Sequence, residues 1–122
     1  MEAVALDRGL DAFRATDAFA VEAYRVAGTL RDGSLGEAIR RTAITAGAAV
    51  VSASAAVPAS VAAAAHLERA REALLEGRYF LYLARRFGLL DVRQYRGLAL
   101  RQDSALREIE AARAERARGR AP

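Results

Sequence analysis

The residues of this chain that could carry chemistry are one histidine and a few carboxylates. His66 is the only histidine among 122 residues, and the chain contains neither cysteine nor lysine. A di-iron helical bundle needs a Glu-x-x-His motif on each of two helices, whereas Ala63 lies three residues before His66. Without cysteine there is no thiol nucleophile or thiolate metal site, and without lysine there is no P-loop or Schiff-base lysine. We therefore expect no metal, no other cofactor and no catalytic residue.

The same residues limit the remaining enzyme classes. A Ser-His-Asp triad needs an exposed nucleophile, and no serine of this chain lies in a strand–turn–helix elbow. We expect His66 to be a surface residue at the start of a helix. An active site shared between subunits would have to use His66 and Glu76, which makes it the weakest of the alternatives. The sequence thus predicts a protein that is not an enzyme.

Glu76 is a carboxylate within the most apolar segment of the chain, between Leu75 and Gly77. A carboxylate that is partly buried needs a cationic partner, because desolvation of an isolated charge is costly. Arg40 or Arg41 of the preceding helix, or an arginine of a neighbouring subunit, would serve. A structural ion pair is the interpretation that we prefer to catalysis.

All nineteen basic residues are arginine, and their distribution is uneven. Residues 78–101 contain six arginines against Asp91 alone, and residues 25–41 add four arginines against two acids. Concentrated arginine beside aromatic residues is typical of phosphate-binding surfaces. The alternative is that these arginines complement helix dipoles and keep the protein in solution. The candidate nucleic-acid-binding residues are Arg31, Arg40, Arg41, Arg78, Arg85, Arg86, Arg93, Arg96 and Arg101.

Apolar spacing predicts four helices that would position these residues. The first runs from about Leu6 or Leu10 to Leu30, with Leu10, Phe13, Ala20, Ala23, Ala27 and Leu30 on its inner stripe. A Ser-x-x-Glu capping box, Ser34 with Glu37, predicts that the second helix begins at Ser34. The inner face of the second helix comprises Leu35, Ile39, Thr42, Ala46, Ala49 and Ala53. Pro58 marks the break before the third helix.

The third helix has the clearest heptad pattern of the chain, and the fourth follows a short turn. The heptad residues are Leu67, Ala70, Leu74, Gly77, Leu81 and Ala84. Gly88 suits a left-handed C-cap, and Asp91 suits the N-cap of the fourth helix. Its inner stripe is Val92, Tyr95, Leu98, Gln102, Ala105 or Leu106, Ile109 and Ala112.

These elements predict the fold class. Ordered helices over about 6–112 and a frayed, arginine-rich tail over 113–122 give one all-α domain covering 1–122. Four amphipathic helices with short loops pack most simply as an up-down-up-down four-helix bundle. In that topology residues 25–41 and 78–101 lie at the same end of the bundle, which is then rich in arginine.

The third helix is apolar on more than one face, because five large residues flank its heptad stripe. They are Tyr79, Phe80, Tyr82, Leu83 and Phe87. A helix that is apolar nearly all round is buried nearly all round. A wide core would explain this pattern, but a subunit interface explains it better, since a helix of a monomeric bundle keeps a solvated face. A homo-oligomer is therefore expected.

Two features bear on the compartment. Residues 42–65 carry no charge, yet they are mainly alanine, so a buried helix explains them better than a membrane span does. The first residues are acidic where a secretory signal carries positive charge. We expect a cytoplasmic protein without a membrane segment.

The order and spacing of several segments resemble a known family over about Leu10 to Ile109. These segments are Phe13 with Ala23–Tyr24, the run Ile39–Thr45, the run Glu76–Ala84, and Phe87–Leu90. They are similar to the small bacterial four-helix-bundle proteins encoded in intervening sequences of 23S rRNA genes. That family is related to the accessory variability protein of diversity-generating retroelements. The run Gly47–Ala53 departs from it, because the family usually shows Pro-x-Asn-Ile-Ala-Glu-Gly there.

The resemblance implies a homopentameric ring without catalytic activity. For the retroelement relatives it also implies a basic surface that contacts RNA and a reverse transcriptase. We therefore expect an oligomeric bundle that binds RNA or DNA, or a ribonucleoprotein, through its arginine-rich end, as a retroelement accessory factor would. The alternative function is a protein-binding or scaffolding module that has no nucleic-acid role.

Overall fold

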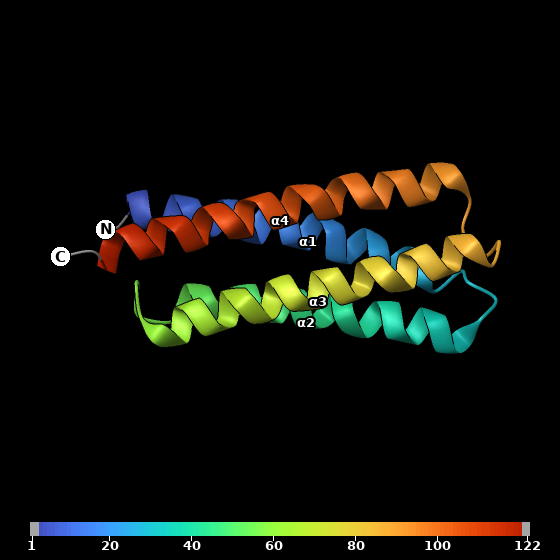
Figure 1. Ribbon diagram of the computed structural model, residues 1–122, viewed down its shortest axis with the longest axis horizontal. Coiled ribbons are helices and arrows are strands. Elements are labelled where there is room, and N and C mark those ends of the chain that lie inside the picture. The colour runs from blue at the N-terminus through green and yellow to red at the C-terminus, as the bar shows by residue number, and fades with distance from the viewer. Residues whose placement is uncertain (1–2, 121–122) are drawn as a thin grey trace.

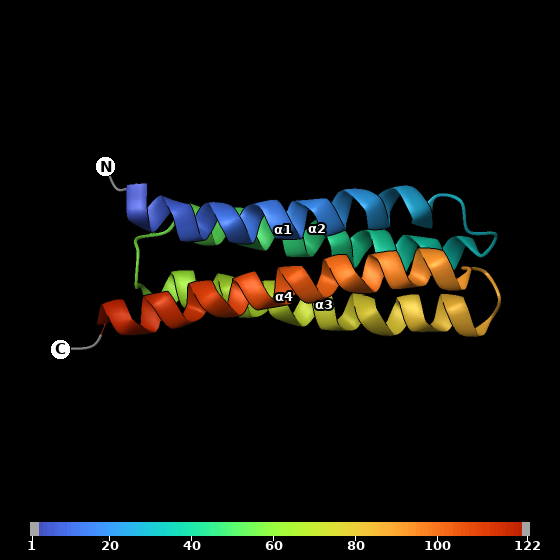
Figure 2. The ribbon, with the colours of Figure 1, turned by 90° about the horizontal axis from the view of Figure 1, so that it is seen from above.

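The computed structural model describes residues 3–120 of the chain, with side chains over 10–118, and this range forms four helices and no strand. They are α1 (Ala3–Ala27), α2 (Gly33–Ala55), α3 (Val61–Arg86) and α4 (Val92–Arg120). Successive helices run antiparallel, so the α1–α2 and α3–α4 loops lie together at one end of the bundle (Figures 1 and 2). The α2–α3 loop lies at the other end with both ends of the chain. The predicted up-down-up-down four-helix bundle is confirmed.

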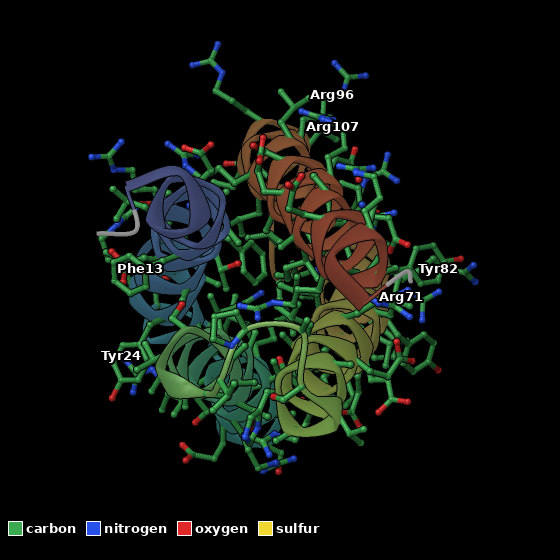
Figure 3. All side chains as sticks on the ribbon, turned by 90° about the vertical axis from the view of Figure 1, so that its left-hand side faces the viewer. Phe13, Tyr24, Arg71, Tyr82, Arg96 and Arg107 are labelled. Atoms are coloured by element: carbon green, nitrogen blue, oxygen red, sulfur yellow. The ribbon has the colours of Figure 1, made fainter. Side chains whose placement is uncertain are left out.

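Each helix contacts two neighbours, and the four helices occupy the corners of a square (Figure 3). α1 contacts α2 and α4, while α3 contacts α2 and α4, and the contact between α2 and α3 is the most extensive. Small residues explain that close approach. A Cβ atom added to Gly77 of α3 would lie 2.8 Å from Thr42 Oγ1 of α2. None of the described helices combines the length and apolar content needed to cross a membrane.

The inner faces of α2, α3 and α4 follow the predicted stripes closely. All six predicted residues of α2 and all six heptad residues of α3 are buried. In α4 the core residues are Leu98, Gln102, Ala105, Ile109 and Ala112, whereas Val92 is exposed.

Gln102 joins a polar network within this core. Its Nε2 donates to the Leu74 carbonyl at 2.5 Å, and its Oε1 accepts a hydrogen bond from Arg78 Nε at 3.0 Å. Because both partners lie on α3, the network fixes the register of α4 against α3.

The predicted inner stripe of α1 is wrong in its first half. Leu10 and Phe13 are exposed, whereas Ala12, Thr16, Phe19, Ala23, Val26 and Ala27 face the core. Both stripes satisfy helical periodicity, so the sequence pattern alone favoured the one with larger residues. The structure buries Ala12, Thr16 and Phe19 instead, while Ala23 and Ala27 belong to both stripes. A Cβ atom on Gly36 would lie 2.7 Å from the Ala27 carbonyl oxygen, so α1 packs close to α2 at the end that both stripes share.

Most of the predicted helix ends are confirmed, and one cap is wrong. Gly88 has φ +74, and Asp91 Oδ1 accepts a hydrogen bond from Gln94 N at 2.7 Å. The predicted capping box of α2 does not form, since Asp32 is the N-cap and its Oδ1 accepts from Leu35 N at 3.0 Å. An aspartate two residues earlier therefore competes successfully with Ser34.

The predicted fraying of residues 113–122 is also wrong over the described part of that segment, because α4 continues to Arg120, and residues 121–122 lie outside the described range. Two arginines hold this last part of the helix against the bundle. Arg113 forms an ion pair of 3.0 Å with Glu68 of α3, and Arg116 Nη2 donates to the carbonyl of Ala53 at 3.3 Å. Ala53 lies in the last turn of α2, and its carbonyl also accepts from Ala56 N at 3.3 Å, so Arg116 adds a second hydrogen bond at the C-terminal end of α2.

Candidate nucleic-acid interface

The bundle end that carries the α1–α2 and α3–α4 loops is strongly basic, and we call it the basic end. It comprises the loops 28–32 and 87–91 and the adjoining helical turns (Figure 1). Residues 25–41 and 78–101 together contribute ten arginines and three carboxylates. Two of the carboxylates, Asp32 and Asp91, are occupied as helix N-caps. The antiparallel topology thus brings the two predicted basic segments together.

Two of the nine candidate arginines have structural roles. The Arg40 guanidinium lies over the Tyr24 ring, 4.1 Å from its centroid, and Arg40 Nε donates to the Tyr24 carbonyl at 3.2 Å. Arg78 donates to Gln102 and also forms an ion pair with Asp103. Both guanidinium groups are therefore engaged within the bundle.

Three further candidates make weaker contacts. Arg85 lies over the Tyr95 ring at 5.4 Å, and Arg86 lies over the Tyr82 ring at 6.0 Å while donating to its hydroxyl at 3.0 Å. Arg101 donates to the Gly97 carbonyl at 3.4 Å. Exposed contacts of this kind stabilise little, so these side chains can rearrange towards a ligand.

The other four candidates, Arg31, Arg41, Arg93 and Arg96, are exposed and make no hydrogen bond, ion pair or ring contact with any described residue. Sequence reasoning missed Arg107, which shares these properties. It lies on the outward side of α4 together with Arg96 (Figure 3). Arg107 follows Arg96 by eleven residues, or about three helical turns, and this spacing could have identified it from the sequence.

Glu76 does not pair with Arg40 or Arg41. It is exposed on α3 and has no ion pair among the described residues, because the helix turns its side chain towards solvent rather than towards α2. A different carboxylate, Glu22, forms an ion pair with Arg25 of its own helix, α1. The hydrogen bond from Arg25 lowers the pKa of Glu22, and the same bond raises the pKa of Arg25.

The five residues predicted to form a subunit interface divide into two groups. Tyr79, Tyr82 and Phe87 are exposed, with 56% of Tyr79 and 64% of Phe87 accessible to solvent. Phe80 and Leu83 are half-buried and pack against the core. The outer face of α3 thus presents aromatic surface, on the side of the bundle opposite to Tyr24 (Figure 3).

A second exposed apolar surface, which sequence reasoning missed, lies between α1 and α2. A hollow of about 290 Å³ is lined by Ala20, Val21, Tyr24, Ala43 and Ile44. A neighbouring hollow of about 230 Å³ is lined by Tyr24, Glu37, Arg40, Arg41, Ile44 and Thr45. The two share Tyr24 and Ile44, and both lie towards the basic end.

His66 is half-buried rather than at the surface, and its Nδ1 has no hydrogen-bond partner within the protein. The described part of the chain brings no three histidine, aspartate or glutamate side chains together as metal ligands. Partial burial lowers the pKa of Arg116, which lies at the opposite end of the bundle.

Comparison with protein-family models and comparison with curated sequences both yield no match. The resemblance to the intervening-sequence family therefore stays a prediction.

Proposed function

We propose that this chain is a non-enzymatic helical bundle that binds nucleic acid, alone or in a ribonucleoprotein, through its basic end. The observation that carries the proposal is a group of exposed arginines there that make no contact with a partner among the described residues: Arg31, Arg41, Arg93 and Arg96. A guanidinium group matches the geometry of phosphate oxygens and is always charged. These side chains come from both loop regions of the basic end, so a phosphate backbone could contact several at once.

The physical basis is electrostatic. Each phosphate neutralised by an arginine releases condensed counterions, so the logarithm of the binding constant falls linearly with the logarithm of salt concentration. The slope is about −0.7 per contact for a single strand and about −0.9 for a duplex. Four contacts predict a slope of roughly −3 to −4.

Self-association is the second part of the proposal. Three exposed aromatic residues support a homo-oligomer, because monomeric proteins seldom expose large contiguous apolar patches. They are Tyr79 and Tyr82 of α3 and Phe87 directly after it. The family resemblance sets the expected number of subunits at five. The same resemblance supports the most specific form of the proposal, in which the protein is a cytoplasmic accessory factor of a retroelement and has RNA and a reverse transcriptase as partners.

A protein-binding or scaffolding module is the alternative. Arg25, Arg85 and Arg86 lie in the last turns of α1 and α3, where positive charge also stabilises the helix dipole. The apolar hollows between α1 and α2 would then receive a protein partner.

A salt series with light scattering tests the proposal. The protein alone should scatter as an oligomer, and a labelled structured RNA should bind with an affinity that falls steeply as salt rises. The double variant Arg31→Gln with Arg41→Gln should reduce the salt slope by about two units.

Arg14→Gln with Arg69→Gln is the matched control. Both arginines are exposed, pair with no residue of the described part of the chain, and lie in the halves of α1 and α3 away from the basic end. This control should leave the slope unchanged. Absence of RNA binding at low salt, or equal effects of the two double variants, would refute the role of the basic end.

A further inference from the structure

The two hollows between α1 and α2 form one continuous surface of mixed chemistry near the basic end. The larger hollow has an apolar floor made by residues that include Val21 and Ile44, which are 62% and 57% exposed. Tyr24 stands between the two hollows and is 45% exposed. The smaller hollow adds the charged groups of Glu37 and Arg41.

The Tyr24 ring is held in place from behind. The Arg40 guanidinium covers one face of the ring and is anchored by its hydrogen bond to the Tyr24 carbonyl. Gly28 makes room for this arrangement, because any Cβ atom at that position would collide with the Arg40 guanidinium. The ring and the guanidinium thus form a preorganised stack beside the apolar hollow.

Two opposite charges of the smaller hollow stay available to a ligand. Glu37 and Arg41 are four residues apart on α2, a spacing that allows an ion pair, yet neither pairs with any described residue. An apolar protein segment seated here would desolvate both charges without replacing their hydrogen bonds, which is unfavourable. A ligand that offers a planar apolar group, hydrogen-bond donors and an anionic group would satisfy the whole surface.

We infer that this surface binds one unpaired nucleotide of a single-stranded nucleic acid, an inference that rests on the proposed function. The base stacks against Tyr24 over the apolar hollow, and the amino group of the base donates to the Glu37 carboxylate. The phosphate of the same nucleotide contacts Arg41. In a duplex the base faces are stacked on neighbouring bases and the edges are paired, so the base must be unpaired. Carboxylates accept from the amino group of cytosine, whereas uracil has no amino group.

The test measures fluorescence anisotropy of labelled oligo(C), oligo(U) and an RNA hairpin duplex with the full chain across a salt series. We expect oligo(C) to bind more tightly than oligo(U) or the duplex. Tyr24→Leu keeps the apolar bulk but removes the aromatic face, and should weaken oligo(C) binding about tenfold without changing the salt slope. Glu37→Gln should abolish the preference for oligo(C) over oligo(U).

Phe13→Leu is the matched control. Phe13 is also an exposed aromatic residue of α1, but it lies in the half of the helix away from the basic end. This variant should bind oligo(C) as the unchanged protein does, and circular dichroism should show the same helix content in the Tyr24→Leu and Phe13→Leu variants.

The outcomes separate this inference from the proposed function. Salt-dependent binding that Tyr24→Leu and Phe13→Leu weaken equally, or equal affinity for oligo(C) and the duplex, would overturn the inference alone. A change in oligomer mass caused by Tyr24→Leu would also overturn it, because the surface would then be a subunit contact. Failure to bind any of the three RNAs at low salt would overturn both.

Discussion

The packing of α1 against α2 predicts opposite effects for one substitution at two glycines of the same helix. Gly36 and Gly47 both lie in α2. A Cβ atom on Gly36 would lie 2.7 Å from the Ala27 carbonyl oxygen, a backbone atom that cannot rotate away, whereas a Cβ atom on Gly47 would meet nothing within 4 Å. Gly36→Ala should therefore destabilise the bundle, and Gly47→Ala should stabilise it.

The expected magnitudes follow from two contributions. Replacing glycine by alanine within a helix gains about 1 kcal/mol of helix propensity at either position. Forcing an extra methyl group into a packed contact costs about 1–3 kcal/mol, and this contribution applies only at Gly36. We expect Gly47→Ala to raise the free energy of unfolding by about 1 kcal/mol. Gly36→Ala should lower it by about 1 kcal/mol, since the clash exceeds the propensity gain.

Thermal unfolding followed by circular dichroism at 222 nm measures both effects at one protein concentration, because the stability of an oligomer depends on concentration. A change of 1 kcal/mol corresponds to a shift in Tm of about 4 °C for a domain of this size. The propensity gain cancels in the difference between the two variants, so that difference isolates the contact with Ala27. Equal stabilisation by both substitutions would show that α1 and α2 do not approach each other as described.

Three further predictions concern the core and the helix caps. Phe19→Ala should lower the free energy of unfolding by about 3–5 kcal/mol, because Phe19 is only 2% exposed. Phe13→Ala, at an exposed position of the same helix, should lower it by less than about 1 kcal/mol. Urea denaturation compares the two, and equal losses would contradict the observed orientation of α1. Gln102→Ala should cost about 2–4 kcal/mol in the same assay, since it removes one buried and one half-buried hydrogen bond and leaves a cavity in the core. A neutral result would contradict the network. Asp91→Ala should cost about 1 kcal/mol by removing the N-cap of α4. Ser34→Ala should change Tm little, because Asp32 caps α2. A larger loss for Ser34→Ala would show that Ser34 caps α2 after all.

The candidate site was only partly predictable from the sequence. The two arginine-rich segments, and their meeting at one end, follow from charge counting and from the antiparallel connection of short loops. Charge counting and loop connection do not predict which arginines lack a partner, because Arg40 and Arg78 resemble Arg41 and Arg96 in the sequence. Their engagement depends on Tyr24, Gln102 and Asp103, which are brought near only by packing between helices.

The sequence by itself determined the helical class, the number of helices, the inner faces of α2 and α3, and the caps at Gly88 and Asp91. These features arise from local interactions, namely helical periodicity, backbone conformation and short-range hydrogen bonds. Only the tertiary structure decided the rotation of α1, the continuation of α4 to Arg120, and the hollow beside Tyr24. Each of these depends on contacts between different helices, such as the packing of Phe19 in the core, Arg113 with Glu68 and Arg40 with Tyr24, and their energies are not encoded in the spacing along one helix.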